Sequence, residues 1–414
     1  MHKNRKSLLL LFFANGISGF AQGVSMLSIP WYFAKNNNTQ VFNYSYAALT
    51  FFIMFFGLYA GTLVDKFSRK NNFLITSLVC GMLIFFIALI GYLNNGLPSY
   101  LVISVFAITM LNYNIHYPTL YAFGQEISSP EQYNKVNSNI EIVGQSTSIL
   151  SGGFAAILLD GFNFSIGHYN MVVMPWQIYD VFMMDAITYF IAAVLIFLIP
   201  YSPIKKINEY STSIYQRLKI GFDYLKENKN VFIFGVGSYM VFAMLLVEIH
   251  AVLPTYIKQH LQAKGNVFAL ADTIYAVGAL SAGFFINKLF KKTAILKAII
   301  MLTFLTVGIF IAAFLSKSVL VIYVVSIILG FCNAGIRVLR LTYMFTIIPN
   351  QIMGRVGSIF NLINVLTRSI FIFIFSQVFF SSSNNIIYAY AIMAVFLFVS
   401  GIALYGVRQN LDTE

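Results

Sequence analysis

Long apolar runs separated by short polar turns recur along the whole 414-residue chain. Each run is about 20 residues or longer, the length that a helix needs to cross a bilayer. The alternating strands of about ten residues that are typical of a membrane barrel are absent from the pattern. We therefore expect an all-α membrane protein with twelve transmembrane helices, over residues 8–34, 44–63, 73–93, 97–124, 137–160, 178–200, 231–257, 266–289, 293–315, 318–345, 356–380 and 385–407.

The composition excludes a soluble or disordered chain. Hydrophobic residues make up 59% of the sequence and charged residues 10%, against about 45–50% and 25% in soluble domains. The two cysteines, Cys80 and Cys332, both lie in apolar runs. They indicate neither a disulfide framework nor a thiolate metal site, so we expect no metal.

The positive charges predict the orientation. The net charge is +12, and 19 of the 26 Lys and Arg residues lie at the two termini or in the loops on their side of the membrane. The opposite loops hold four, and three lie inside helices. Because cytoplasmic loops of membrane proteins are rich in Lys and Arg, both termini are expected in the cytoplasm. This topological role of the Lys and Arg residues accounts for the positive net charge, so we expect no nucleic-acid partner.

Residues 201–230 form the longest loop on the basic side and carry six of those cations. Within it, Ile214–Leu225 has the pattern of an amphipathic helix that lies on the membrane surface. The loop divides the chain into an N-terminal six-helix bundle (1–200), a cytoplasmic linker (201–230) and a C-terminal six-helix bundle (231–414).

The two halves resemble each other at a nearly constant offset. Residues 61–70 (GTLVDKFSRK) recur as 283–292 (GFFINKLFKK), and residues 130–138 (PEQYNKVNS) as 349–358 (PNQIMGRVGS). Pro30 likewise corresponds to Pro254. Basic loops match each other easily, but this does not explain the shared glycine and prolines. Two pseudo-symmetric six-helix halves are typical of secondary transporters with a substrate site near the membrane midplane.

Residues 61–70 resemble the loop between helices 2 and 3 of the major facilitator superfamily. Residues 29–32 (IPWY), 117–119 (YPT), 185–189 (DAITY) and 349–356 further resemble the branch that contains macrolide-efflux and siderophore-export transporters. The resemblance implies an exporter in the bacterial inner membrane, a monomer, and a cavity lined by helices 1, 4, 7 and 10. Many relatives carry an acid in helix 1 where this chain has Gln22, so an acid elsewhere must carry protons.

The loop motif predicts a gate. Gly61 has no side chain and lets helices approach closely. Asp65 can pair with Arg69 or accept hydrogen bonds from another helix, a contact that exists only in one state of a transporter. Lys70 and Arg340 join this predicted gating group. The alternative for the basic residues is a plain turn that holds the topology.

Polar side chains inside the predicted helices form single-faced stripes. An ionisable group at mid-membrane costs about 2.5–3.5 kcal/mol, so such residues face a wet cavity or a partner. Stripes occur on the first, fourth, fifth, tenth and eleventh helices, and the third, ninth and twelfth read as almost purely apolar. We expect substrate contact from Gln22, Asn112, His116, Asn333, Arg337, Asn361, Asn364 and Arg368. Hydrogen-bonded structural roles are the alternative for His116, and an inter-helix ion pair for Arg340 and Glu141.

Three acids are candidates for proton coupling: Glu248 first, then Glu141 and Asp185. Glu248 lies near the middle of a cavity helix with no cation one turn away, and burial disfavours the ionised form of a carboxyl. Asp180 and Asp272 are interpreted as caps of helix N-termini.

The sequence thus predicts a secondary active transporter, a proton-coupled exporter of a small organic molecule such as a metallophore or a drug. Import or facilitated diffusion of a nutrient and lipid flipping remain alternatives. An enzyme is not expected, because the five histidines form no H-E-x-x-H motif and no phosphate-binding loop is present. A non-transporting receptor would not need the polar stripes. The expected partners are the substrate, protons and lipid, with a proton gradient in place of a cofactor.

Overall fold

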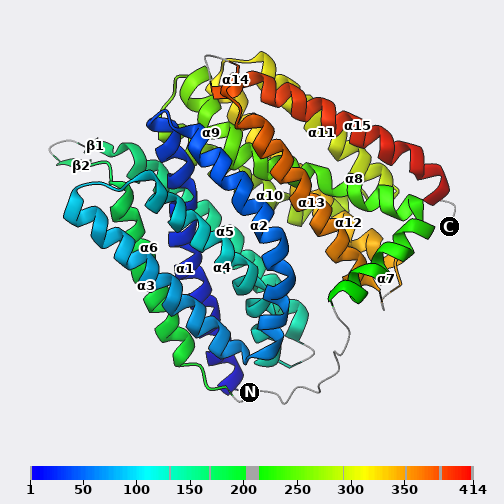
Figure 1. Cartoon of the computed structure of the whole chain (residues 1–414), viewed down its shortest axis with the longest axis horizontal. Coiled ribbons are helices and arrows are strands. Elements are labelled where there is room, and N and C mark those ends of the chain that lie inside the picture. The colour runs from blue at the N-terminus through cyan, green and yellow to red at the C-terminus, as the bar shows by residue number, and fades with distance from the viewer. Residues whose placement is uncertain are drawn as a thin grey trace. The chain divides into compact units, whose positions relative to one another are not determined.

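The computed structural model describes residues 2–129, 132–166, 169–201, 214–291, 293–349, 352–381 and 385–411. These residues are almost entirely helical (Figure 1). The elements, in chain order, are α1 (His2–Lys35), α2 (Thr39–Lys66), α3 (Arg69–Asn94), α4 (Ser99–Glu126), α5 (Tyr133–Asp160), β1 (Phe162–Ile166), β2 (Tyr169–Val173), α6 (Ile178–Phe197), α7 (Ile214–Glu227), α8 (Lys229–Val247), η2 (Glu248–Val252), α9 (Leu253–Thr255), η3 (Tyr256–His260), α10 (Gly265–Leu289), α11 (Ile295–Leu315), α12 (Val319–Ile347), α13 (Met353–Phe375), α14 (Val378–Ser381) and α15 (Ile387–Leu411).

Ten helices among the described residues are long and apolar enough to cross a membrane. They correspond to α1, α3, α5, α6, the continuous stretch Lys229–His260, α10, α11, α12, α13 and α15. Helices α2 and α4, of 28 residues each, are also longer than the roughly 20 residues that a crossing needs. The structure is therefore compatible with the twelve crossings predicted from the sequence.

The chain divides into two compact units. One comprises residues 1–36 and 52–207, and the other residues 37–51 and 208–414. Within the first unit, α1 packs against α5 and α6, and α3 packs against α4 and α6. Within the second, α10 packs against α12, α11 against α12 and α15, and α8 against α13 and α15. The first part of α2 is grouped with the second unit.

Glycines permit the closest helix contact of the second unit, between α10 and α12. A methyl group added at Gly278 would lie 2.0 Å from the Ile327 carbonyl oxygen, and one at Gly330 would lie 2.0 Å from the Tyr275 carbonyl oxygen. Two backbones can approach so closely only where neither residue has a side chain. This contact places the polar residues of α10 and α12 side by side.

The seventh predicted helix is not a uniform α-helix. Two π-helical turns, η2 and η3, flank the short segment that contains Pro254. The backbone N–H of Leu253 donates to the carbonyl of Glu248, five residues earlier. A proline cannot donate a backbone hydrogen bond and displaces the carbonyl one turn before it, which favours such widening. Glu248 therefore begins an irregular turn inside a membrane-spanning helix.

Two elements lie outside the predicted spans. Helix α7 agrees with the amphipathic helix predicted in the linker. It packs against α13, where Gly221 lies close to the Arg355 backbone, and the Tyr224 hydroxyl donates to the Ile347 carbonyl at 3.2 Å.

The antiparallel hairpin β1–β2, with Phe162 opposite Val173, was not predicted. Its short runs of aromatic and β-branched residues are the local signal for strands.

Candidate functional site

Glu248 lies in the interior of the second unit. Only 3% of its surface is exposed, and its Oε1 accepts a hydrogen bond from the Tyr390 hydroxyl of α15 at 2.8 Å. Among the described residues, no basic side chain forms an ion pair with it. A buried carboxylate is unfavourable when its only partner is a neutral donor and no countercharge is near. Such a group is a candidate for binding and releasing a proton.

Asp272 acts electrostatically on Glu248. Helix α10 begins at Gly265, so Asp272 lies well inside it, and the prediction that Asp272 caps the helix N-terminus is wrong. The predicted helix 266–289 already placed Asp272 almost two turns inside its start, where a side chain cannot act as the N-terminal cap. Two carboxyls from different helices therefore lie in one region of the second unit.

Beyond Glu248 the helix is held firmly at η3. The Tyr256 hydroxyl lies within hydrogen-bond distance of the Ala313 and Ser316 carbonyls, at 2.7 and 2.9 Å. His260 contacts the Ser316 carbonyl at 3.1 Å. These contacts tie the far end of the helix to the end of α11, so that the irregular turn at Glu248 lies between two fixed segments.

Arg368 of α13 is buried in the second unit with 8% exposure, and its Nε has no hydrogen-bond partner among the described residues. Tyr46 and His250 lie near it, in edge-to-face contact with each other at 5.7 Å between ring centroids. A guanidinium stays charged at all accessible pH values. An arginine in apolar surroundings without an acid partner can bind an anion or carboxylate supplied from outside.

Arg340, predicted as a gating residue, and Asn364, predicted as a substrate contact, both bond to the backbone of α8. Arg340 donates to the Ser238 carbonyl at 2.9 Å, and its guanidinium lies 3.5 Å from the centroid of the Tyr239 ring. The Asn364 amide donates to the Tyr239 carbonyl at 3.2 Å. These contacts hold α12 and α13 against α8, and a bound ligand would have to compete with them.

The remaining predicted residues of the second unit differ in exposure. Asn333 is buried and donates to the Tyr275 hydroxyl at 3.0 Å. Arg337, one turn further along α12, and Asn361 of α13 are exposed. An exposed arginine in the middle of a membrane-spanning helix is well placed for a ligand, because lipid would not stabilise its charge.

In the first unit, Asp185 of α6 is completely buried. Ser25 of α1 lies within reach of its carboxyl, and Cys80 of α3 and Tyr113 of α4 are near enough to interact with it electrostatically. Neither carboxyl oxygen has a hydrogen-bond partner of normal geometry among the described residues. Four residues further along α6, the Tyr189 hydroxyl accepts a hydrogen bond from Asn112, a predicted substrate contact, at 3.2 Å.

Three other predicted residues of this unit have partners. Gln22 bonds to Ser18 one turn earlier on α1. His116 lies 3.0 Å from Oδ1 of Asn15, which is compatible with the structural role considered for it. Glu141 is exposed on α5 and accepts a hydrogen bond from the Tyr121 hydroxyl at 2.5 Å.

The predicted gating motif is described only in part, because the surroundings of Gly61 and the side chain of Asp65 lie outside what the structure describes. Arg69 pairs with Glu126 at the end of α4, at 3.5 Å. The Lys70 ammonium donates to the Phe197 and Ile199 carbonyls, at 2.8 and 2.7 Å, where α6 ends. Both residues therefore join helix ends of the first unit.

Tyr201 completes this cluster at the helix ends. Its hydroxyl donates to Glu126 Oε2 at 2.5 Å. Partial burial, and then the hydrogen bond to the carboxylate, raise the pKa of the Tyr201 hydroxyl well above its ordinary value. The hydroxyl is therefore a permanent donor at physiological pH.

The residue that the sequence analysis missed is Tyr390. The twelfth predicted helix was expected to add nothing polar, but it supplies the hydroxyl that meets Glu248. Tyr189 and Tyr275 were missed in the same way. The only available signal is a tyrosine in an otherwise apolar run, because its hydroxyl must find a partner when it is buried.

A multi-pass helical membrane protein that buries carboxyl and guanidinium groups in its interior has the features of a membrane transporter. The sequence profile of the Major Facilitator Superfamily matches residues 11–372. The chain therefore belongs to this superfamily, and it is a transporter and not an enzyme. No curated protein sequence matches it.

Solved transporters of this superfamily share the fold at low sequence identity. A bacterial homologue of the human lysosomal transporter Spinster is 10% identical with a TM-score of 0.72, over 99% of this chain and 98% of that one. The nucleoside transporter NupG is 12% identical with a TM-score of 0.70, over 97% and 98%. A D-xylose–proton symporter is 12% identical with a TM-score of 0.69, over 96% and 97%. These likenesses support the fold alone.

Proposed function

We propose that this transporter is a proton-coupled exporter of a small organic anion or zwitterion, such as a carboxylate metallophore, and that Glu248 carries the proton. The observation that carries the proposal is the buried Glu248 carboxyl, with the Tyr390 hydroxyl as its neutral donor. The resemblance of several sequence motifs to efflux and siderophore-export transporters supports the direction.

The proton step follows from the surroundings of Glu248. A buried carboxylate without a countercharge is unfavourable, so the group gains or loses its proton when water or substrate reaches it. The π-helical turn that begins at Glu248 gives this part of the helix an alternative backbone arrangement. A proton carrier at an irregular turn can thus link its charge to a change in helix conformation.

The substrate class follows from the arginines. Arg368 offers a buried guanidinium with an unpartnered Nε, and Arg337 offers an exposed one in mid-helix. A carboxylate or another planar anion matches a guanidinium in charge and geometry. A cationic drug would be repelled by both arginines, although Glu248 would attract it.

The first experiment measures proton release from purified protein in weakly buffered detergent solution. The probes are a citrate-type carboxylate metallophore, the cation ethidium and the neutral sugar xylose. We expect the metallophore to release protons from the wild-type protein, and Glu248→Gln to bind it without release. The control is Asp223→Asn, which removes an exposed acid of α7 and should leave the release unchanged.

Other outcomes would contradict the proposal. Unchanged release in Glu248→Gln would move the proton site to Glu141 or Asp185. Binding of the metallophore without any release in the wild type would exclude proton antiport and favour facilitated diffusion. Release by ethidium alone would overturn the anionic substrate class.

Direction is tested in membrane vesicles of known sidedness. Everted vesicles with an acidic interior should accumulate the metallophore if the protein exports it in exchange for protons. Uptake into right-side-out vesicles driven by an acidic exterior would show a proton-coupled importer instead. Glu248→Gln in the same vesicles separates coupled transport from leakage.

A further inference from the structure

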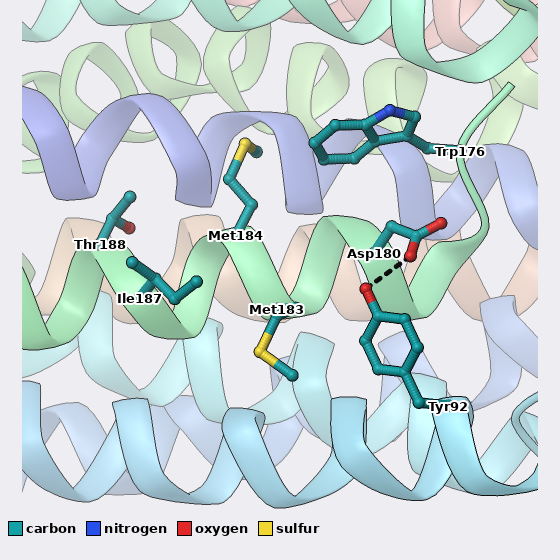
Figure 2. Close-up of a pocket in the computed structure, with 7 residues that line it drawn as sticks. All are labelled: Tyr92, Trp176, Asp180, Met183, Met184, Ile187 and Thr188. Atoms are coloured by element: carbon teal, nitrogen blue, oxygen red, sulfur yellow. Dashed lines mark hydrogen bonds between the residues drawn. The ribbon is translucent and has the colours of Figure 1, made fainter. Parts of the chain in front are cut away.

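A pocket with a volume of about 530 Å³ lies between the end of α3 and the beginning of α6, within the first unit. Its lining residues are Tyr92, Trp176, Asp180, Met183, Met184, Ile187 and Thr188. Figure 2 shows Tyr92, Trp176 and Asp180 together at one end, Ile187 and Thr188 at the other, and the two methionines between them. The volume falls in the range of pockets that hold small molecules.

The end of the pocket near the helix termini is anionic and aromatic. Asp180 accepts a hydrogen bond from the Tyr92 hydroxyl at 2.6 Å and one from the Gln177 backbone N–H at 2.8 Å, as a residue near a helix N-terminus commonly does. None of the seven lining residues is cationic. Each carboxylate oxygen retains lone-pair capacity, and Trp176 and Tyr92 offer ring faces to a cation.

The other end of the pocket is apolar and continuous with a lipid-facing surface. Ile187, Ile191 and Val194 are exposed by 49%, 41% and 59% and lie along one face of α6. Thr188 adds no free donor, because its hydroxyl bonds to the Asp185 carbonyl at 2.8 Å. From Asp180 to Ile187 the helix rises about 10 Å. Tryptophan and tyrosine are typical of the membrane–water interface, and Met and Ile of the zone below it.

We propose that this pocket is a binding site for a phospholipid with a primary ammonium headgroup, such as phosphatidylethanolamine. The ammonium donates to the Asp180 carboxylate beside Trp176 and Tyr92, and the start of an acyl chain lies along Met183, Met184 and Ile187. An ammonium carries three donors and matches a carboxylate that has no cationic partner in the pocket. The site binds a component of the membrane, so it does not depend on the direction or substrate of transport.

The test is lipid retention measured by native mass spectrometry. The full-length protein is purified from vesicles that contain equal amounts of phosphatidylethanolamine, phosphatidylglycerol and phosphatidylcholine of one chain length. We expect phosphatidylethanolamine to be retained at least about threefold over each of the others, which corresponds to about 0.7 kcal/mol. Asp180→Asn, which removes the charge at nearly constant size, should abolish this preference.

A second variant fills the pocket without changing Asp180. Ile187→Trp should displace the lipid, whereas Ile191→Trp, one turn further along the same exposed face and outside the pocket, should not. If Asp180→Asn fails to fold, the comparison of these two tryptophan variants still decides whether the pocket holds the lipid.

Three results would overturn the proposal. Equal retention of phosphatidylcholine would show that the aromatic rings bind any cation and that no primary ammonium is selected. Equal retention of phosphatidylglycerol would show that the headgroup charge is not recognised. A preference that survives in Ile187→Trp would place the lipid elsewhere on the protein.

Discussion

Among the described residues, one carboxyl in each unit is almost without exposed surface, and these two carboxyls have different surroundings. In the second unit, Glu248 meets the Tyr390 hydroxyl, lies under the electrostatic influence of Asp272 and begins a π-helical turn. In the first unit, Asp185 is completely buried on a regular helix, without a hydrogen-bond partner of normal geometry among the described residues. The difference supports the proposal that Glu248, and not Asp185, carries the proton.

The largest expected effect is the loss of uphill transport in Glu248→Gln. One proton moved down 100 mV and one pH unit supplies about 2.3 plus about 1.4 kcal/mol, enough for a substrate gradient of several hundredfold. The variant should exchange substrate across vesicles but build no gradient, and accumulation of labelled metallophore measures both. If Asp185→Asn and not Glu248→Gln abolishes accumulation, the roles of the two carboxyls are reversed.

The next largest effect is a loss of stability when a side chain is added to a glycine at a close helix contact. In Gly278→Ala the new methyl would meet the Ile327 carbonyl of α12 at 2.0 Å, so α10 and α12 must separate. We expect a loss of about 1–3 kcal/mol or more in the free energy of unfolding.

Thermal and denaturant unfolding in detergent can compare this variant with two others. Gly124→Ala in the first unit meets a side-chain methyl of Val136 at 2.9 Å and no backbone atom as near, and should lose less. Gly308→Ala meets nothing within 4 Å and should lose nothing. Equal losses in all three would show that the backbone contact is not special.

A smaller effect is expected from Asp185→Asn. The amide has nearly the shape of the carboxyl and removes an ionisable group from a buried site, so transport should stay within about twofold and stability within about 1 kcal/mol. Transport and unfolding of the purified variant check this expectation. A strong loss of transport with intact stability would show that Asp185 also takes part in coupling.

The smallest expected effect is a difference in stability between lysine variants in the two copies of the loop motif. Lys70 donates to two carbonyls at the end of α6, whereas Lys291 of the second copy, which aligns with Arg69, is exposed. Lys70→Gln should cost about 1 kcal/mol of unfolding free energy, and Lys291→Gln about zero. Identical values would mean that the two loops are equivalent in spite of their different contacts.

Much of the fold was predictable from the sequence. Membrane-spanning length and polar turns depend on local patterns, and they predicted the helices and the linker helix α7. The resemblance of residues 61–70 to a known loop motif predicted the superfamily. The burial of several polar residues was also predictable, because an ionisable residue in an apolar run is rare and must avoid lipid. The β1–β2 hairpin was not, because its pairing depends on where α5 ends and α6 begins. The cap assignment of Asp272 was avoidable, because the predicted helix 266–289 already contained this residue.

The sequence by itself determined which segments can enter a membrane and which of their residues are too polar for lipid, since both follow from the solvation of individual side chains. Only the tertiary structure decided how those residues are paired. Glu248 and Tyr390 are 142 positions apart, and whether they meet depends on the rotation and register of helices packed against each other. Local periodicity does not encode that rotation, because many helix arrangements bury the same polar stripe.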